Sequence, residues 1–216
     1  MTRRVFDVSE PVSPATAVFP GDTPFSQEWV MRMEDGASCN VSTMRMSVHC
    51  GTHTDAPLHF DSQGRGMAEV SLDAYLGRCR VVDVRGVGDP PLIPAEALTD
   101  AVLAGVERIL FRTHDRHDPN TFDPGFTAVG PAAAARLVAA GIRLVGIDTP
   151  SVDHASSQDL AGHQVLYRGG VAILENLDLG GVPAGDYELI ALPLKLVGSD
   201  SSPVRAILRE LPEAGR

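Results

Sequence analysis

The feature of this chain best suited to chemistry is a run of histidines and one aspartate within residues 49–59. His49, His53, Asp55 and His59 offer imidazole and carboxylate groups, which are ligands of zinc, manganese and iron(II). The residues between them are small or turn-forming, unlike those of a buried strand. The segment therefore predicts a metal site, and a chance cluster of surface histidines is the alternative.

The spacing of these residues constrains the backbone. Gly51 and Pro57 disfavour a helix, although residues four apart would share a helical face. In an extended chain His49, His53 and Asp55 also share a face, but the two histidines would be roughly 13 Å apart at about 3.3 Å per residue. Metal–ligand bonds are only about 2 Å long, so the chain must curl, and Gly51 permits the curl. A carboxylate at Asp55 could bridge two ions.

Two further ligand types lie downstream. Glu175 follows the apolar run 171–174, and a carboxylate at the end of a buried strand needs a partner, either a metal ion or an arginine. His163 lies in a polar segment and is a weaker candidate. Asp148, Thr149 and Ser151 follow another apolar run, where they could hydrogen-bond to metal ligands or form a capped turn. His114, His117 and His154 lie in polar loop sequence and are expected to be solvated, with a place at the pocket rim as the alternative.

Composition restricts the class of protein. The chain has 216 residues, 44% of them hydrophobic, and a net charge of −10, which disfavours binding to nucleic acid. No secretory signal or run of about 18 apolar residues is present, so no membrane association is expected. The three cysteines lack CxxC spacing, which favours a cytoplasmic location over a disulfide framework.

The predicted elements alternate between strand and helix only in the middle of the chain. This favours an α/β fold with one domain over residues 1–216 and a mixed, strongly curved sheet with outer helices, not a doubly wound parallel sheet. GxGxxG, P-loop and GxSxG motifs do not occur. Strands are predicted at 4–8, 27–33, 41–48, 80–84, 108–112, 144–148, 171–175, 187–192 and 204–211, the last with a short helix as the alternative, and helices at 72–76, 94–103, 131–140 and 157–167.

These motifs resemble those of the metal-dependent cyclase family. The pattern His-x-Gly-Thr-His-x-Asp-x-Pro-x-His begins at His49 and carries the resemblance first. Within the family, the chain is similar to the bacterial arylformamidases that act on N-formyl-L-kynurenine, and the likeness runs almost end to end. It includes residues 7–9, 20–24, 55–59, 146–151, 172–175 and 185–195.

The resemblance implies a fold, a cofactor and an assembly. The fold is a barrel-like core of mixed sheet, of the swivelling β/β/α type, with helices outside. The cofactor is zinc, as two ions per subunit, with manganese as the alternative, and the assembly is a homodimer or a dimer of dimers. The implied roles are His49, His53 and Asp55 as ligands of one ion; Asp55, His163 and Glu175 as ligands of the second; and His59 as general acid/base.

The implied activity is hydrolysis of N-formyl-L-kynurenine to L-kynurenine and formate in tryptophan degradation. Two close cations would lower the pKa of a bound water and stabilise the oxyanion. His59 would accept a proton from that water and deliver one to the leaving nitrogen, with an outer supporting role as its alternative.

Phe19 departs from the formamidase pattern, which has tryptophan at this position. The position contributes an aromatic wall for the substrate ring, and phenylalanine offers less area and no N–H donor. Phe19 would therefore affect substrate preference, unless it only packs in the core.

Two other hypotheses compete with this activity. The chain could be a relative that opens a cyclic amide such as isatin, or a non-enzymatic metal-stabilised protein with a closed site.

Overall fold

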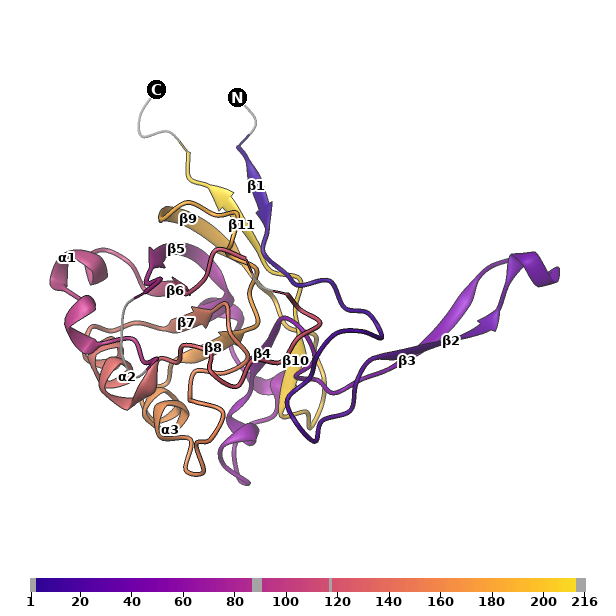
Figure 1. The fold of residues 1–216 in the computed structure, drawn as a ribbon, viewed down its shortest axis with the longest axis horizontal. Coiled ribbons are helices and arrows are strands. Elements are labelled where there is room, and N and C mark those ends of the chain that lie inside the picture. The colour runs from indigo at the N-terminus through magenta and orange to yellow at the C-terminus, as the bar shows by residue number, and fades with distance from the viewer. Residues whose placement is uncertain (1–2, 87–90, 117, 213–216) are drawn as a thin grey trace.

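A curled nine-stranded sheet forms the body of the protein in the computed structural model, which describes residues 3–86, 91–116 and 118–212 (Figure 1). The strand order is β1-β11-β9-β5-β6-β7-β8-β4-β10. The strands are β1 (Val5–Asp7), β4 (His53–Asp55), β5 (Leu76–Asp83), β6 (Arg108–Arg112), β7 (Leu144–Ile147), β8 (Ala172–Glu175), β9 (Gly185–Ile190), β10 (Ser201–Pro203) and β11 (Ile207–Glu210).

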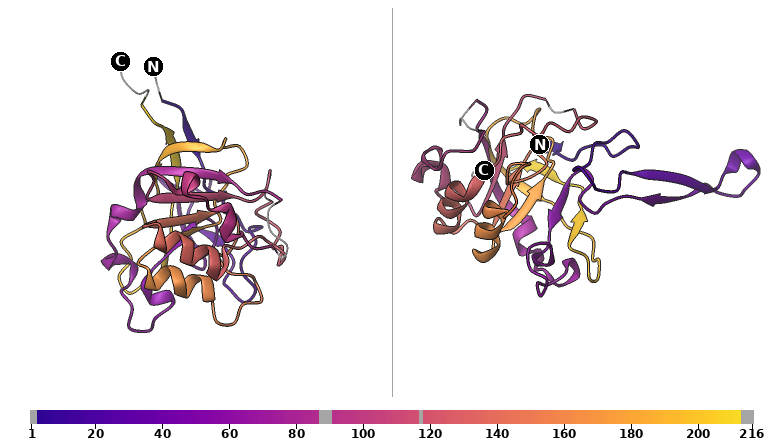
Figure 2. Two further views of the ribbon diagram at one scale, coloured as in Figure 1. Left: turned by 90° about the vertical axis from the view of Figure 1, so that its left-hand side faces the viewer. Right: turned by 60° about the horizontal axis from the view of Figure 1, so that its bottom comes forward.

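The sheet is mixed. Neighbouring strands from β5 to β8 pair in parallel, and every other neighbouring pair is antiparallel. The two views of Figure 2 show how strongly the sheet curls along its length. The prediction of an α/β chain with a mixed, strongly curved sheet and outer helices is therefore confirmed.

Helices cover one face of the parallel strands. The helices α1 (Asp100–Leu103), α2 (Gly130–Ala139) and α3 (Ala161–Arg168) gather on the same side of the sheet (Figure 1). Ile109 and Phe111 of β6 pack into the helix-side core, whereas Leu110 between them packs into a second core. This alternation is the period of two that a strand imposes on its side chains.

The second core lies inside the curl. It brings together residues from both ends of the chain with the central strands, including Val8, Cys79, Leu174 and Leu208. Burial of these apolar side chains is the main source of stability for a sheet of this size. The curl thereby joins the first and last strands to the parallel centre.

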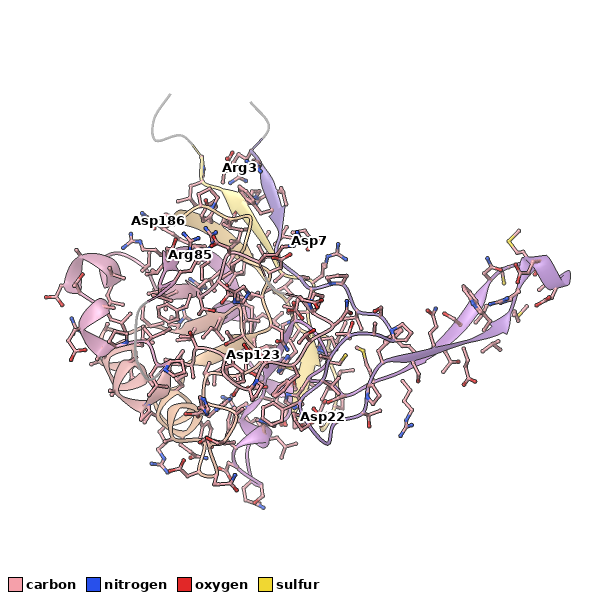
Figure 3. The ribbon with its side chains drawn as sticks, viewed as in Figure 1. Arg3, Asp7, Asp22, Arg85, Asp123 and Asp186 are labelled. Atoms are coloured by element: carbon pink, nitrogen blue, oxygen red, sulfur yellow. The ribbon has the colours of Figure 1, made fainter. Side chains whose placement is uncertain are left out.

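A two-stranded arm projects away from this body. It consists of β2 (Ser26–Met31) and β3 (Val41–Arg45), joined through a short 3-10 turn, η1 (Met33–Asp35). Every residue of both strands is exposed, and Figure 3 shows side chains standing off both sides of the arm. At its base, near the labelled Asp22, the Ser47 hydroxyl donates to the Asp22 carboxylate. Both strands were predicted, with somewhat longer bounds.

The single helix predicted over 94–103 is wrong. The segment divides into a 3-10 turn, η5 (Ala95–Ala97), and the short helix α1. Leu98 leaves the helical region at φ −88° and ψ 63°, and the Thr99 side chain accepts a hydrogen bond from the Val102 amide. Threonine favours this capping position over a helix interior, which is why the helix restarts there.

The predicted helix at 157–167 begins later than expected, at Ala161. Leu160 has a positive φ of 48°, so the preceding residues cannot continue the helix. The short strands β4 and β10 were not predicted as strands, whereas β6 has the bounds that the sequence predicts. Within residues 3–86, 91–116 and 118–212, no helix is long and apolar enough to cross a membrane.

Candidate metal centre and its cavity

The register between β4 and β8 builds the centre of the site. His53 is the direct partner of Glu175 in this antiparallel pair, and Asp55 lies two residues further along β4. Residues two apart on a strand point to the same face, so the three side chains converge. All three are buried, and the His53 Nε2 atom lies 3.3 Å from Glu175 Oε2 and 3.7 Å from Asp55 Oδ1.

A bend at Gly51 brings His49 to the same place. Gly51 has a φ of +68°, and a Cβ there would lie 2.7 Å from a methyl group of Val12. His49 Nδ1 lies 3.3 Å from Asp55 Oδ1, and the His49 and His53 rings are 4.9 Å apart. The predicted curl of the chain at this glycine is therefore present.

The helix α3 supplies His163 from the opposite side. Its Nε2 atom lies 3.2 Å from Glu175 Oε1 and 3.8 Å from Asp55 Oδ2. Asp153 holds this histidine, because its carboxylate accepts hydrogen bonds from the backbone amides of Gly162 and His163 and contacts His163 Nδ1 at 2.7 Å. One carboxylate therefore caps the helix and orients the ring.

The polar atoms at the centre are suited to a cation. Both Asp55 carboxylate oxygens and His53 Nε2 are buried and make no hydrogen bond to any described residue. Such atoms are costly unless an ion or another partner satisfies them. Two groups with ligand atoms within 4.8 Å of one another meet at Asp55, namely His49–Asp55–His59 and His53–Asp55–Glu175. The donor set of imidazoles and carboxylates fits zinc or manganese.

The ionisable groups stabilise one another strongly. Burial disfavours the charged form of His49, but Asp55 and Asp200 outweigh it and raise the pKa of His49 to about 9. Burial likewise opposes the charge on His163, but Asp153 and Glu175 raise the pKa of His163 to about 10. Burial opposes the Glu175 carboxylate too, yet His163 and His53 hold the pKa of Glu175 well below its usual range. A metal ion must therefore compete with protons for these nitrogens.

His59 lies at the mouth of this cluster. It ends the 3-10 turn η2 (Pro57–His59), its side chain is 31% exposed, and its ring centroid is 4.4 Å from that of His49. Asp200, which precedes β10, faces both rings: one of its oxygens is 3.0 Å from His49 Nε2 and 3.5 Å from His59 Nδ1. His59 is thus accessible while the histidines at 53 and 163 are buried.

A cavity of about 430 Å³ opens onto the cluster and is lined by His49, His53, His59, His163 and Glu175. Phe19 forms part of its wall, 39% exposed, with its ring edge-on to Phe122 at 5.2 Å. His154 lines the same cavity and stacks on Phe126. The cavity therefore joins the polar cluster that could hold a metal ion to an aromatic wall.

Three other predicted residues, Ser151, Asp148 and His114, lie outside the cluster of candidate ligands. The Ser151 hydroxyl accepts a hydrogen bond from the Asp153 amide two residues on, which fits the capped turn, the second of the two hypotheses for that segment. Asp148 instead accepts hydrogen bonds from Thr113 and lies 3.7 Å from His114 Nε2. His117 lies outside the described residues.

The structure brings all six candidates, at 49, 53, 55, 59, 163 and 175, to one place. Ligand atoms lie within 4.8 Å of one another in two groups, one of His49, Asp55 and His59 and one of His53, Asp55 and Glu175. The assignment to two ions stays a prediction. Asp153 and Asp200 were missed. The signal for Asp153 was its place ten residues before His163 and before a helix; no local signal marks Asp200.

Comparison with known proteins places the chain in a family. Residues 6–154 match the family model described as putative cyclase. The chain belongs to the cyclase family. A kynurenine formamidase from Delftia acidovorans (strain DSM 14801 / SPH-1) is 50% identical over 211 residues, covering 98% of this chain and 100% of that protein. Another from Paracidovorax citrulli (strain AAC00-1) is 48% identical over 211 residues, covering 96% and 97%.

Solved structures of cyclase-family proteins share the fold. A predicted metal-dependent hydrolase from Bacillus stearothermophilus is 30% identical with a TM-score of 0.81, covering 98% of this chain and 100% of that chain. Isatin hydrolase A from Labrenzia aggregata has a TM-score of 0.83 at 23% identity, covering 97% and 94%, and this likeness concerns the fold alone. The predicted family is confirmed, and the formamidase relatives support a cyclase-family amidohydrolase.

Proposed function

We propose that this protein hydrolyses N-formyl-L-kynurenine to L-kynurenine and formate, as a metal-dependent arylformamidase of tryptophan degradation. The observation that carries the proposal is the match to proteins named kynurenine formamidase over nearly the whole chain at about 50% identity. The unsatisfied oxygens of Asp55 support metal dependence.

The proposed ligands are the residues that meet around Asp55. His49, His53 and Asp55 would hold one zinc ion, and Asp55, His163 and Glu175 would hold a second, with manganese as the alternative metal. Such ions, when bound, supply Lewis acidity that lowers the pKa of a water and polarises a carbonyl oxygen. The inner side of this site is closed to solvent, because His53, His163 and Glu175 are all buried.

His59 is proposed to move the protons. It accepts one proton from the attacking water as the new C–O bond forms at the formyl carbon. It then donates that proton to the arylamine nitrogen as the C–N bond breaks, so that formic acid and a neutral amine leave. Formic acid then loses the second proton of the water to solvent and becomes formate. Its place at the mouth of the cluster and in the wall of the cavity supports this role.

Phe19 is proposed to bind the aryl ring of the substrate. Its ring and that of Phe122 present apolar faces to the same cavity that holds His59. An aromatic ring held there would place an attached formamide toward the histidines, since the cavity connects the two ends.

The decisive experiment measures L-kynurenine release by metal-reconstituted protein, with chelated protein as the control and isatin tested in parallel. Metal-dependent release is expected. Ring opening of isatin without kynurenine release would keep the metal chemistry and change the substrate. Loss of folding on chelation, with hydrolysis of neither compound, would support the non-enzymatic alternative.

We also propose that the protein is a homodimer, alone or paired into a dimer of dimers, with the arm as contact surface. Trp29 is 47% exposed and Met44 63% exposed on this arm, and an isolated two-stranded ribbon is marginal in water. Light scattering should give a dimer or a tetramer for the wild type and a smaller particle for Trp29→Ser/Met44→Ser.

We propose a cytoplasmic location, which the free thiols at Cys39, Cys50 and Cys79 support.

A further inference from the structure

We propose that Asp200 is the positioning residue for His59, holding its proton on Nδ1 and leaving Nε2 as the atom that exchanges protons with water and substrate. The inference rests on the proposed function, in which His59 is the general acid/base. It adds a residue to that function whose place in sequence is far from the histidine motif.

The backbone around Asp200 is fixed to the strand that carries the ligands. The Ala56 amide donates to the Asp200 carbonyl at 2.8 Å, and the next residue, Ser201, pairs with Asp55. Ser201 is fully buried, and its hydroxyl donates to the carbonyls of Thr54 and Val48. Asp200 is therefore held at the start of β10, where its carboxylate cannot drift far from the histidine loop.

The carboxylate faces two imidazoles with a single oxygen. Asp200 Oδ2 lies 3.0 Å from His49 Nε2 and 3.5 Å from His59 Nδ1. The first is a hydrogen bond, whereas the second is longer than the roughly 2.7–3.2 Å of an N–H···O hydrogen bond and would come within that range with a small rotation of the His59 ring. Phe60 packs edge-on against His59, with ring centroids 4.9 Å apart, on another side of the imidazole.

The consequence for His59 follows from the two-nitrogen nature of imidazole. When Nδ1–H faces a carboxylate, Nε2 is unprotonated and basic, and the carboxylate stabilises the imidazolium that forms after proton uptake. Without that carboxylate, both the tautomer and the ring orientation are free.

The test separates proton delivery from all other roles. Asp200→Ala is compared with wild type and with Asp61→Ala, a nearby carboxylate whose partner is the Tyr167 hydroxyl. Two substrates are used: formanilide, whose anilide nitrogen needs a proton to leave, and p-nitrophenyl formate, whose phenolate leaves without one. We expect Asp200→Ala to lose about 10- to 100-fold on the anilide and a smaller factor on the ester, which needs His59 to accept a proton from water but not to donate one to the leaving group.

Two measurements beside activity complete the design. Metal content of the purified variants is determined, because Asp200 also contacts His49. The tautomer of His59 is read from nitrogen-15 NMR of the imidazole, assigned by its loss in His59→Gln. We expect unchanged metal content, and an Nδ1–H tautomer for His59 in wild type that shifts toward Nε2–H in Asp200→Ala.

Several outcomes would overturn the inference. Equal losses on anilide and ester, or metal lost in proportion to activity, would make Asp200 a support for His49. An Nε2–H tautomer of His59 in the wild type would refute the positioning role directly. If the wild type hydrolyses neither substrate, the proposed function fails, while the NMR measurement still decides whether Asp200 sets the His59 tautomer.

Discussion

His53 on β4 and Glu175 at the end of β8 are direct partners across an antiparallel pair, with His53 Nε2 3.3 Å from Glu175 Oε2. This single register joins the histidine motif to a residue from the last third of the chain. Asp55, two residues along from His53, is then held between the imidazoles of His49 and His163. Strand pairing therefore assembles the candidate metal centre around the Asp55 carboxylate.

Replacing Asp55 by alanine is expected to remove both metal ions, because its two buried oxygens face ligands on both sides. Metal content measured by mass spectrometry should fall from about two ions to none, with Asp61→Ala as a control that retains them. Retention of two tightly bound ions by Asp55→Ala would contradict the shared-ligand arrangement.

Replacing His59 by alanine is expected to leave metal binding intact and to lower kcat by roughly 10²- to 10⁴-fold, the usual contribution of a general acid/base. The His59 side chain is partly exposed, and the proposed ligands at 53, 163 and 175 are buried away from it. Turnover and metal content are measured on the same preparation. Parallel loss of both would reassign His59 as a ligand, as its position near His49 and Asp55 would permit.

Replacing Asp153 by asparagine is expected to weaken metal affinity by about 10- to 100-fold without unfolding the protein. Its carboxylate contacts His163 Nδ1 at 2.7 Å and caps α3. Competition with a chromophoric chelator measures the affinity, and circular dichroism reports the fold. The exposed Asp159→Asn is the matched control; an equal effect of the two substitutions would show that overall charge, not orientation of His163, is responsible.

The elements that could be predicted are those whose cause is local. The strand β6 follows from its apolar run, and α2 from an alanine-rich segment with glycine after it. The division of 94–103 into two pieces depended on the capping preference of Thr99, which competes with the helical pattern. The strands β4 and β10 have three residues each and exist through pairing with distant partners, so no local periodicity reveals them.

The same reasoning applies to the site. The candidate ligands at 49–59 could be predicted because they lie close together in the sequence, with Gly51 between them. The positive φ of Gly51 confirms the predicted bend. Asp200 is near His59 because β10 pairs with β4, and this pairing of distant segments cannot be predicted from residue spacing. Residue types at short spacing predict the chemistry, and long-range register decides which carboxylates surround it.

Replacing Phe19 by alanine is expected to raise KM for N-formyl-L-kynurenine by roughly 2- to 10-fold, with a smaller effect on kcat, since an aromatic contact is worth about 0.5–1.5 kcal/mol. Phe19→Trp should lower KM by adding ring area to the same wall. Steady-state kinetics with an aliphatic N-formyl amino acid provide the control, because it has no ring to contact. Equal changes for both substrates would assign Phe19 to packing against Phe122.

The buried Asp148 is expected to make stability depend on pH in a defined direction. Burial raises the pKa of Asp148 to about 7, against the hydrogen bonds from Thr113 that lower it. The folded protein therefore binds a proton at Asp148 more tightly than the unfolded chain does, whose value is near 3.8. Stability is lost as pH rises between these two values and is level above about 7.

Asp148→Asn isolates this effect, because the amide stays neutral while nearly keeping the shape of the side chain. Urea unfolding of chelated protein between about pH 4 and pH 8 should show the wild type losing stability relative to the variant as pH rises, with a ceiling of about 4 kcal/mol. Titration of the histidine cluster is common to both proteins and cancels in the difference. If the difference in unfolding free energy between the two proteins stays constant with pH, the prediction is wrong. The hydrogen bonds from Thr113 would then keep Asp148 charged over the whole range, and its pKa would not be raised by burial.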